Sequence, residues 1–199
     1  MERDRHGARQ PHRFDPKRAH LLDEAERFET LPPADVFALL DAPQGATVVD
    51  FGTGTGTYAI ELARSRPDVR VIALDEQREM LQRLEAKLTQ TPLRNLESVL
   101  APSPESRALE GQADCILGLN VLHELGDEAL EQVRALLKPD GVAAFIDWNA
   151  QVERPIGPPR EHVYSPSEAS ERLEKHGFLL LRERLFLLHY GLACRRKDG

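Results

Sequence analysis

The sequence predicts an α/β fold built on a mostly parallel β-sheet, and three observations support this prediction. Apolar runs of strand length alternate with longer segments of helical periodicity, which is the order that strands and covering helices follow around a parallel sheet. A glycine-rich turn, in VVDFGTGTGTYAIELA (48–63), joins the first strand to the helix that follows it. The length of 199 residues is that of one ordinary domain, so we expect a single domain over residues 1–199.

Before the first strand we expect a basic arm and a helical cover. Residues 1–18 carry six Lys and Arg against three Asp and Glu, and we interpret residues 1–15 as a flexible arm. Residues 16–45 are interpreted as an N-terminal helical cover. Five candidate strands then follow in order: TVVDF, VRVIALD, NLESVLA, ADCILGLN and GVAAFIDW.

Helices between these strands are indicated by apolar residues that share one helical face. Such faces comprise Met80, Leu81, Leu84 and Leu88 in one segment, and Leu130, Val133, Leu136 and Leu137 in another. The second helix is expected to end in KPDG, because neither Pro139 nor Gly141 prolongs a helix well.

A proline-rich connection, residues 149–164, follows the fifth strand. We interpret it as a substrate-side loop, because long irregular loops in compact domains are usually functional. SPSEASERLEKHG then predicts a capped helix that begins near Ser165 or Ser167 and ends at Gly177. FLLLRERLFLLHYGLACRR predicts two strands in a hairpin.

Composition argues against several classes of protein. The chain is 41% apolar and 30% charged, it has no apolar run near the roughly 20 residues of a membrane helix, and its N-terminus lacks the apolar core of a secretory signal. We therefore expect a cytoplasmic protein with no membrane partner. Beyond residue 18 there are 20 Lys and Arg against 30 Asp and Glu, which disfavours a nucleic-acid partner. Cys115 and Cys194 lie in apolar runs, so we expect buried thiols with neither a disulfide framework nor a metal site.

The glycines of the first turn predict a nucleotide-like ligand. Glycine at a strand-to-helix turn lets the backbone turn tightly and lets a ligand approach main-chain N–H groups. Gly52, Gly54 and Gly56 follow the pattern G-x-G-x-G, whereas a dinucleotide fingerprint has its third glycine where this chain has Thr57. The lysine and hydroxyl of a P-loop are missing as well. This spacing argues against a nicotinamide-dependent oxidoreductase, which is the first alternative function.

Two acids flank this turn. Asp50 lies near the end of the first strand, and Asp75 ends the second in VIALDEQREML. A carboxylate at the second position can accept both ribose hydroxyls of a nucleoside that lies across the sheet edge, although Asp75 is also placed to cap the following helix. Asp50 has a buried context, where a structural hydrogen bond is the alternative to contact with a ligand. A nucleoside without phosphates fits this pattern.

On these residues the chain resembles the class I S-adenosylmethionine-dependent methyltransferases. The DFGTGTG turn and the strand ending in Asp75 resemble their S-adenosylmethionine site. Further stretches are similar to small bacterial methyltransferases of the ubiquinone and menaquinone biosynthesis group: FDPKRAHLLDEAERFETLPPADVFALL, LNVLHEL, LKPDGVAAFIDW and GPPREHVYSPSEASERLEKHGF. The resemblance implies a Rossmann-like class I methyltransferase fold, with a seven-stranded, mostly parallel sheet, an antiparallel last strand and helices on both faces. It also implies S-adenosyl-L-methionine as the cofactor.

Roles for the cofactor-site residues follow from the same resemblance. It implies that Asp50 orders the loop, Asp75 takes the ribose hydroxyls, Glu76 lies by the adenine edge, Asn120 faces the sulfonium, and Gly52, Gly54 and Gly56 pass beneath the methionine portion. Related enzymes often carry an acid after the third strand, but LAPSPESRAL (100–109) has none at that position. Adenine would then rely on backbone groups or on Glu105. Phe14 and His20, before the first strand, are expected either to cover the cofactor or to belong to a surface helix.

Residues after the fourth and fifth strands are candidates for the acceptor side, because substrates bind at the carboxyl edge of such a sheet. His123 and Asp147 are candidate catalytic bases, although a histidine at a helix start can also serve only the backbone. Candidate pocket residues are Trp148, Arg160, His162 and Tyr190, with Arg160 suited to an anionic acceptor. The alternatives are core packing for Trp148, solvent exposure for Arg160, and a division of His189 and Tyr190 between core and surface.

The predicted function is methyl transfer to a small-molecule acceptor by in-line displacement. Alignment of the reacting atoms and exclusion of water would supply most of the catalysis. The second alternative is a non-catalytic module that binds S-adenosylmethionine or S-adenosylhomocysteine as a sensor or subunit partner. We expect the protein to be a monomer or a homodimer.

Overall fold

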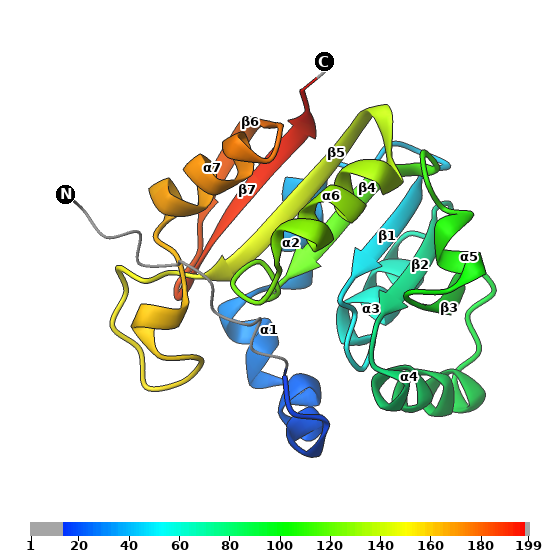
Figure 1. Ribbon diagram of the computed structural model, residues 1–199. Coiled ribbons are helices and arrows are strands. Elements are labelled where there is room, and N and C mark those ends of the chain that lie inside the picture. Colours follow the sequence, from blue (N-terminus) through cyan, green and yellow to red (C-terminus); the bar gives the residue numbers. More distant parts are fainter. Residues whose placement is uncertain (1–13, 198–199) are drawn as a thin grey trace.

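A computed structural model describes residues 14–197, so the arm expected over residues 1–15 lies outside the described residues except for its last two. Its strands form a seven-stranded sheet in the order β3-β2-β1-β4-β5-β7-β6. They are β1 (Thr47–Phe51), β2 (Arg70–Asp75), β3 (Leu96–Leu100), β4 (Ala113–Leu119), β5 (Leu137–Trp148), β6 (Phe178–Leu185) and β7 (His189–Arg196). The first five pair in parallel, whereas β7 is antiparallel to both β5 and β6 (Figure 1). The predicted sheet with an antiparallel last strand is confirmed.

Helices cover both faces of this sheet. They are η1 (Pro16–Asp23), α1 (Glu26–Thr30), α2 (Pro33–Leu40), α3 (Thr57–Ser65), α4 (Arg78–Gln90), α5 (Pro104–Arg107), α6 (Asp127–Leu136), η2 (Arg160–His162) and α7 (Pro166–Lys175). One apolar cluster joins the sheet to α2, α3 and α4, and the other joins it to α6 and α7. Successive strand residues alternate between the two, as Val48 and Val49 do, because neighbouring side chains of a strand point to opposite faces.

The end of α6 differs from the prediction. The helix ends at Leu136, and Leu137, expected on its apolar face, is instead the first residue of β5 and pairs with Ala113 of β4. Its side chain is buried in the second cluster in either case, so the helical period could not separate the two elements. Pro139 and Gly141 therefore lie inside an extended segment and not in a turn after the helix.

The C-terminal third follows the predicted pattern closely. Ser165 is the N-cap of α7, and it forms a reciprocal capping box with Glu168. Gly177 has φ +76° and ends the helical segment, a conformation that glycine adopts without steric cost. The hairpin of β6 and β7 then completes the sheet.

Three other expectations concern buried thiols, metals and membranes. Cys115 and Cys194 are both free and buried. Within residues 14–197 there is no cluster of His, Cys, Asp and Glu that would hold a metal ion. Over the same range, every helix is too short or too polar to cross a membrane.

The carboxyl ends of β1, β2, β4 and β5 meet at one edge of the sheet, which is the lower edge in Figure 1. The blue N-terminal helices η1 and α1 lie below this edge, and the yellow connection between β5 and α7 lies beside it (Figure 1). Two segments far apart in the sequence therefore border the same sheet edge.

Candidate active site

A cleft of about 2310 Å³ opens at this edge. Its walls come from the glycine turn, the ends of β2, β4 and β5, the N-terminal helices, and residues 155–159, 161 and 162 of the proline-rich loop. Cavities that bind one drug-sized ligand have volumes of roughly 300–1,000 Å³. The cleft is therefore large enough for a nucleoside cofactor and a second molecule together.

The glycine turn is anchored to β2. The N–H groups of Gly52 and Thr53 donate to the carbonyl of Leu74 at 2.8 and 3.0 Å. Gly52 and Gly54 have φ of +71° and +57°, and a Cβ on Gly52 would lie 2.7 Å from Cγ1 of Val121. The turn therefore needs glycine both for its backbone conformation and for the close approach of the segment after β4.

Gly56 has a different role from the one that the resemblance implies. It is the N-cap of α3 with φ +76°, and it is absent from the cleft wall. A Cβ at this position would lie 2.4 Å from Cδ1 of Leu84. The third glycine thus permits the turn to pack on α4 and does not contact the ligand space.

Asp75 has its carboxylate directed at the glycine turn. Oδ2 accepts a hydrogen bond from the Gly54 N–H at 2.7 Å, and Oδ1 accepts one from the Gln77 N–H at 2.8 Å. Burial raises its pKa, although these two hydrogen bonds oppose the shift. A carboxylate has about four lone-pair directions, so both oxygens of this cleft residue retain capacity for a ligand. Glu76 beside it is exposed and also borders the cleft.

Asp50 acts within the loop and borders the cleft as well. Its Oδ2 accepts a hydrogen bond from Thr53 Oγ1 at 2.6 Å. The side chain is only 3% exposed, and burial raises its pKa to about 6, with the nearby charge of Asp75 acting in the same direction. The structural hydrogen bond that the sequence analysis weighed is therefore present.

A polar cluster that the sequence did not reveal ties η1 to the glycine turn. Asp23 Oδ1 accepts hydrogen bonds from Thr55 Oγ1 (2.6 Å), Thr57 Oγ1 (2.7 Å) and Lys87 Nζ (2.6 Å). Partial burial raises the pKa of Asp23, but these donors outweigh it, so the pKa lies below its usual value. Thr57, which replaces the third glycine of a dinucleotide fingerprint, thus helps to hold the N-terminal cover. We call these four residues the Asp23 latch.

On the other side of the cleft, His123 and Asp147 form a pair. His123 Nδ1 lies 2.8 Å from Asp147 Oδ1, and the His123 backbone N–H donates to Oδ2 at 2.9 Å. Burial lowers the pKa of His123, but the charge and hydrogen bond of Asp147 raise it more, so the net shift is upward. Asp147 is completely buried and absent from the cleft wall. Contrary to the expectation of a base beside the acceptor, Asp147 does not border the ligand space, and its carboxylate contacts His123 instead.

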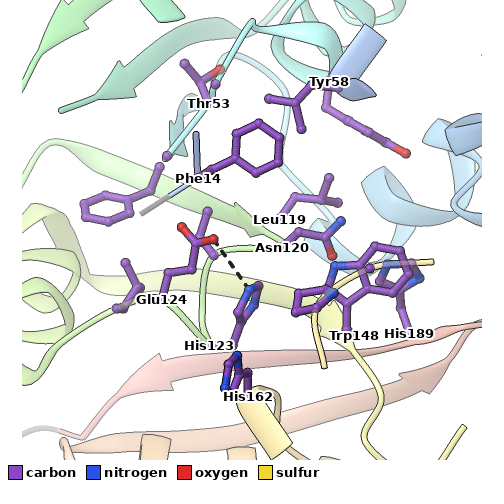
Figure 2. Close-up of a pocket in the computed structure, with 18 of the residues that line it drawn as sticks. Phe14, Thr53, Tyr58, Leu119, Asn120, His123, Glu124, Trp148, His162 and His189 are labelled. Atoms are coloured by element: carbon purple, nitrogen blue, oxygen red, sulfur yellow. Dashed lines mark ion pairs between the residues drawn. The ribbon is translucent and has the colours of Figure 1, made fainter. Parts of the chain in front are cut away.

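Glu124, which no sequence pattern singled out, lies beside this pair. Its Oε1 is 3.6 Å from His123 Nε2, the contact drawn as a dashed line in Figure 2. Burial raises the pKa of Glu124 to about 7, while His123 opposes the shift. Glu124 directly follows His123 in LNVLHEL, and this adjacency was the only indication in the sequence. Adjacency alone does not show that both side chains face the cleft.

Two aromatic rings, those of Trp148 and His189, pack together in the cleft wall next to Asn120. Trp148 and His189 lie with ring centroids 4.0 Å apart and planes at 34° (Figure 2). Asn120 has φ +56° and lies on the same side of the cleft (Figure 2). His162 and Phe14 also border the cleft. Trp148 therefore faces the ligand space and is not confined to the core.

Four other candidates lie elsewhere. Successive residues of β7 point to opposite faces of the sheet. Tyr190 points into the second apolar cluster, where it is completely buried. Arg160 is exposed, and its Nε donates to the carbonyl of Ala150 at 2.8 Å. This hydrogen bond joins two residues of the same loop. Glu105 and His20 are exposed and absent from the cleft wall. The expectations that Tyr190 and Arg160 line the acceptor pocket are therefore wrong, and Glu105 does not replace the missing adenine contact.

The seven-stranded sheet with its antiparallel last strand, and the glycine turn beside the cleft, are the features of a class I methyltransferase. A family model described as a methyltransferase domain matches residues 48–141. The crystal structure of a SAM-dependent methyltransferase from Aquifex aeolicus is 31% identical to this chain, with a TM-score of 0.82, and the match covers 92% of this chain and 98% of that chain. This chain belongs to the S-adenosylmethionine-dependent methyltransferases.

Two further structures share the fold. The 16S rRNA (adenine(1408)-N(1))-methyltransferase from Catenulisporales acidiphilia is 22% identical with a TM-score of 0.64, and the match covers 85% of this chain and 93% of that chain. The mitomycin 7-O-methyltransferase is 25% identical with a TM-score of 0.68, and the match covers 92% of this chain and 58% of that chain. Proteins of this fold thus act on acceptors of very different size.

The residues of the cleft fit S-adenosylmethionine, which is the cofactor of this family. Gly52 and Gly54 leave the backbone of the turn accessible where a Cβ would obstruct it. Asp75 offers carboxylate oxygens at the cleft wall. Ala101, at the position where an acid is missing, borders the cleft without contributing a charge.

Proposed function

We propose that this protein transfers the methyl group of S-adenosylmethionine to a small-molecule acceptor, with His123 as the base that removes the acceptor's proton. One observation carries this proposal. His123, oriented by Asp147, borders the same cleft as the glycine turn and Asp75, so a base and a nucleoside site share one cavity.

The residues of β1 and β2 bind the cofactor in this proposal. Asp75 accepts the ribose hydroxyls, Glu76 lies beside the adenine, and the backbone at Gly52 and Gly54 supports the methionine portion. Asn120, directly after β4, faces the sulfonium. Their positions on the cleft wall support these roles.

The chemistry requires alignment and a proton acceptor. When bound, S-adenosylmethionine supplies a methyl group whose bond to sulfur breaks as its bond to the acceptor forms, with the electron pair remaining on sulfur. In this proposal His123 carries its proton on Nδ1, which donates to Asp147, so Nε2 is the nitrogen that accepts the acceptor's proton. The proline-rich loop and the N-terminal helices border the cleft and reduce the access of water to it.

Charge supports a small acceptor over a nucleic acid. Among the side chains on the cleft wall, Asp and Glu outnumber Arg and Lys, and the net charge of the chain is −7. Such a surface repels a phosphate backbone. The related mitomycin 7-O-methyltransferase takes a small acceptor, whereas the related rRNA methyltransferase does not.

The test is a screen in which S-adenosylhomocysteine is quantified after incubation with S-adenosylmethionine and a panel of small hydroxyl and amine acceptors. We expect saturable binding of S-adenosylhomocysteine by calorimetry, turnover with one class of acceptor, and loss of turnover without loss of binding in His123→Gln. The proposal fails if S-adenosylhomocysteine does not bind, or if rRNA but no small molecule is methylated.

A further inference from the structure

The imidazole of His189 is buried without using its hydrogen-bonding groups. Its side chain is 1% exposed, and within residues 14–197 neither Nδ1 nor Nε2 has a hydrogen-bond partner. Burial of a polar group without a partner is unfavourable. Stacking on Trp148 accounts for the position of the ring but not for the presence of two nitrogens in it.

The ring borders the acceptor side of the cleft. His189 pairs with Trp148 across β5 and β7, and both residues belong to the cleft wall. Figure 2 shows the two rings next to Asn120 and across from His123. Asn120 Oδ1 is also buried and lacks a partner among the described residues. Two side chains at one end of the cavity are thus left with free hydrogen-bonding capacity.

The chemical state of His189 limits what it can bind. Burial lowers the pKa of His189 to about 3, while Asp147 opposes the shift and Arg27, Arg154 and His123 support it. The ring is therefore uncharged at neutral pH, with one nitrogen as donor and the other as acceptor. A hydroxyl group, which can both donate and accept, is complementary to it.

Three arginines near this end of the cleft donate hydrogen bonds to main-chain carbonyls. Arg154 lies over the Trp148 ring at 5.3 Å and donates to the Pro158 carbonyl. Arg172 donates to the carbonyls of Leu122 and Leu125. Arg160 donates to that of Ala150. An anionic acceptor would therefore meet a wall on which Asp and Glu outnumber Arg and Lys, and the net repulsion disfavours it.

We propose that His189 is a hydrogen-bonding residue of the acceptor site and that the acceptor is an uncharged, hydroxyl-bearing molecule. This inference rests on the proposed function, since it assigns the charge and chemical class of the acceptor in the same cleft.

The experiment compares three phenols of similar size: tyrosol, which is uncharged, 4-hydroxyphenylacetate, which is an anion, and tyramine, which is a cation. Each is titrated into protein saturated with S-adenosylhomocysteine. Affinity is measured by ligand-observed NMR, and the ring nitrogens of His189 by nitrogen-15 NMR. We expect tyrosol to bind most tightly and to shift the His189 nitrogens.

Three variants separate hydrogen bonding from packing. His189→Phe keeps a ring against Trp148 but removes both nitrogens, and we expect it to weaken tyrosol three- to tenfold, the usual effect of one hydrogen bond. His189→Asn restores a donor and an acceptor and should recover part of that loss. His20→Phe, at an exposed position outside the cleft, should have no effect.

The alternatives give distinct results. Tightest binding of the anion or the cation, binding of none of the three, or unchanged His189 nitrogen signals would overturn the inference while leaving the cofactor site intact. If His189→Phe does not fold, the nitrogen signals of the unmodified protein still decide the question. Failure of S-adenosylhomocysteine itself to bind would defeat the proposed function, and the inference with it.

Discussion

The two halves of the cleft differ in how completely their polar groups are paired. On the β1 and β2 side, Asp75, Asp50 and Asp23 all accept hydrogen bonds from the chain itself. On the β4, β5 and β7 side, Asn120 Oδ1 and both His189 nitrogens have no partner within residues 14–197. The β1 and β2 side is therefore organised without a ligand, whereas the β4, β5 and β7 side has polar groups that can form hydrogen bonds with one.

This difference matches what each half must bind. A cofactor is the same molecule for every member of a family, and a preorganised site avoids the cost of ordering the chain on binding. An acceptor differs from one enzyme to the next, and its identity depends on the particular groups that the chain leaves free. Four substitutions test this contrast.

The largest effect is expected for Asp147→Asn, which disturbs the acceptor half alone. General-base catalysis contributes about 10²–10⁴-fold, and we expect turnover to fall by about 10²–10³-fold because His123 is no longer held in one orientation. Because Asp147 raises the pKa of His123, its loss lowers that pKa, so the acid limb of the rate profile moves to lower pH. Turnover as a function of pH and NMR titration of the His123 ring measure both effects.

Binding of S-adenosylhomocysteine serves as the control for Asp147→Asn and should be unchanged. A His123 pKa that stays the same or rises would contradict the assigned pair.

The next largest effect is expected for Asp75→Ala in the cofactor half. Each hydrogen bond to a charged group is worth about 1.5–3 kcal/mol, so loss of two ribose contacts should weaken S-adenosylhomocysteine by about 100-fold or more. Calorimetric titration measures this change. Asp68→Ala, an exposed acid paired with Arg66, is the matched control, and equal losses in both variants would refute the ribose assignment.

A smaller effect is expected for Asp23→Ala, which breaks the Asp23 latch. Its three donors lose their shared acceptor, and net contributions of about 0.5–1.5 kcal/mol per hydrogen bond predict release of S-adenosylhomocysteine that is faster by about tenfold or more. Stopped-flow displacement measures the release rate. Because the pKa of Asp23 lies below its usual value, its contribution is fully present between about pH 5 and 8, and a loss that varies across this range would contradict the latch.

The smallest effect is expected for Gly157→Ala in the proline-rich loop. Gly157 has φ +89°, and a Cβ would lie 3.0 Å from Trp148 Cε2. Backbone strain of about 1–2 kcal/mol lowers the midpoint of thermal unfolding by a few degrees for a chain of this size.

Gly45→Ala isolates the contact in this last comparison. Gly45 also has a positive φ, but a Cβ there has nothing within 4 Å. Both variants carry backbone strain, and only Gly157→Ala should also change acceptor affinity and the emission of Trp148. Indistinguishable behaviour would mean that the loop does not pack on Trp148 in solution.

Local patterns sufficed for the sheet and for the residues at the ends of its strands. Asp75 and His123 were identified because a parallel sheet brings the carboxyl ends of its strands to one edge, so their position follows from sequence alone. Leu137 was misplaced because its burial is the same in a helix or a strand. This error reflects the limit of short-range periodicity as a guide to the boundary between a helix and a strand.

The remainder depends on contacts between distant segments. Asp23 meets Lys87 across 64 residues, Gly56 packs on Leu84, and His189 stacks on Trp148 only because β7 is antiparallel to β5. None of these contacts has a local signal. The sequence predicts Tyr190 in the pocket, but its neighbour His189 lies there instead. Which of the two residues faces the cleft is set by the pairing of β7 and not by its composition.

The unpartnered ring nitrogens of His189 favour acceptor binding but lower the stability of the fold. Replacement of a buried, unpartnered polar group by an apolar group of similar shape is neutral or stabilising, so the ligand-free His189→Phe protein should unfold at the same temperature as the natural protein or a higher one. The substitution that weakens acceptor binding would then strengthen the fold. Selection for thermal stability alone would therefore remove this histidine. Its presence makes the ligand-free fold less stable and the acceptor site more selective.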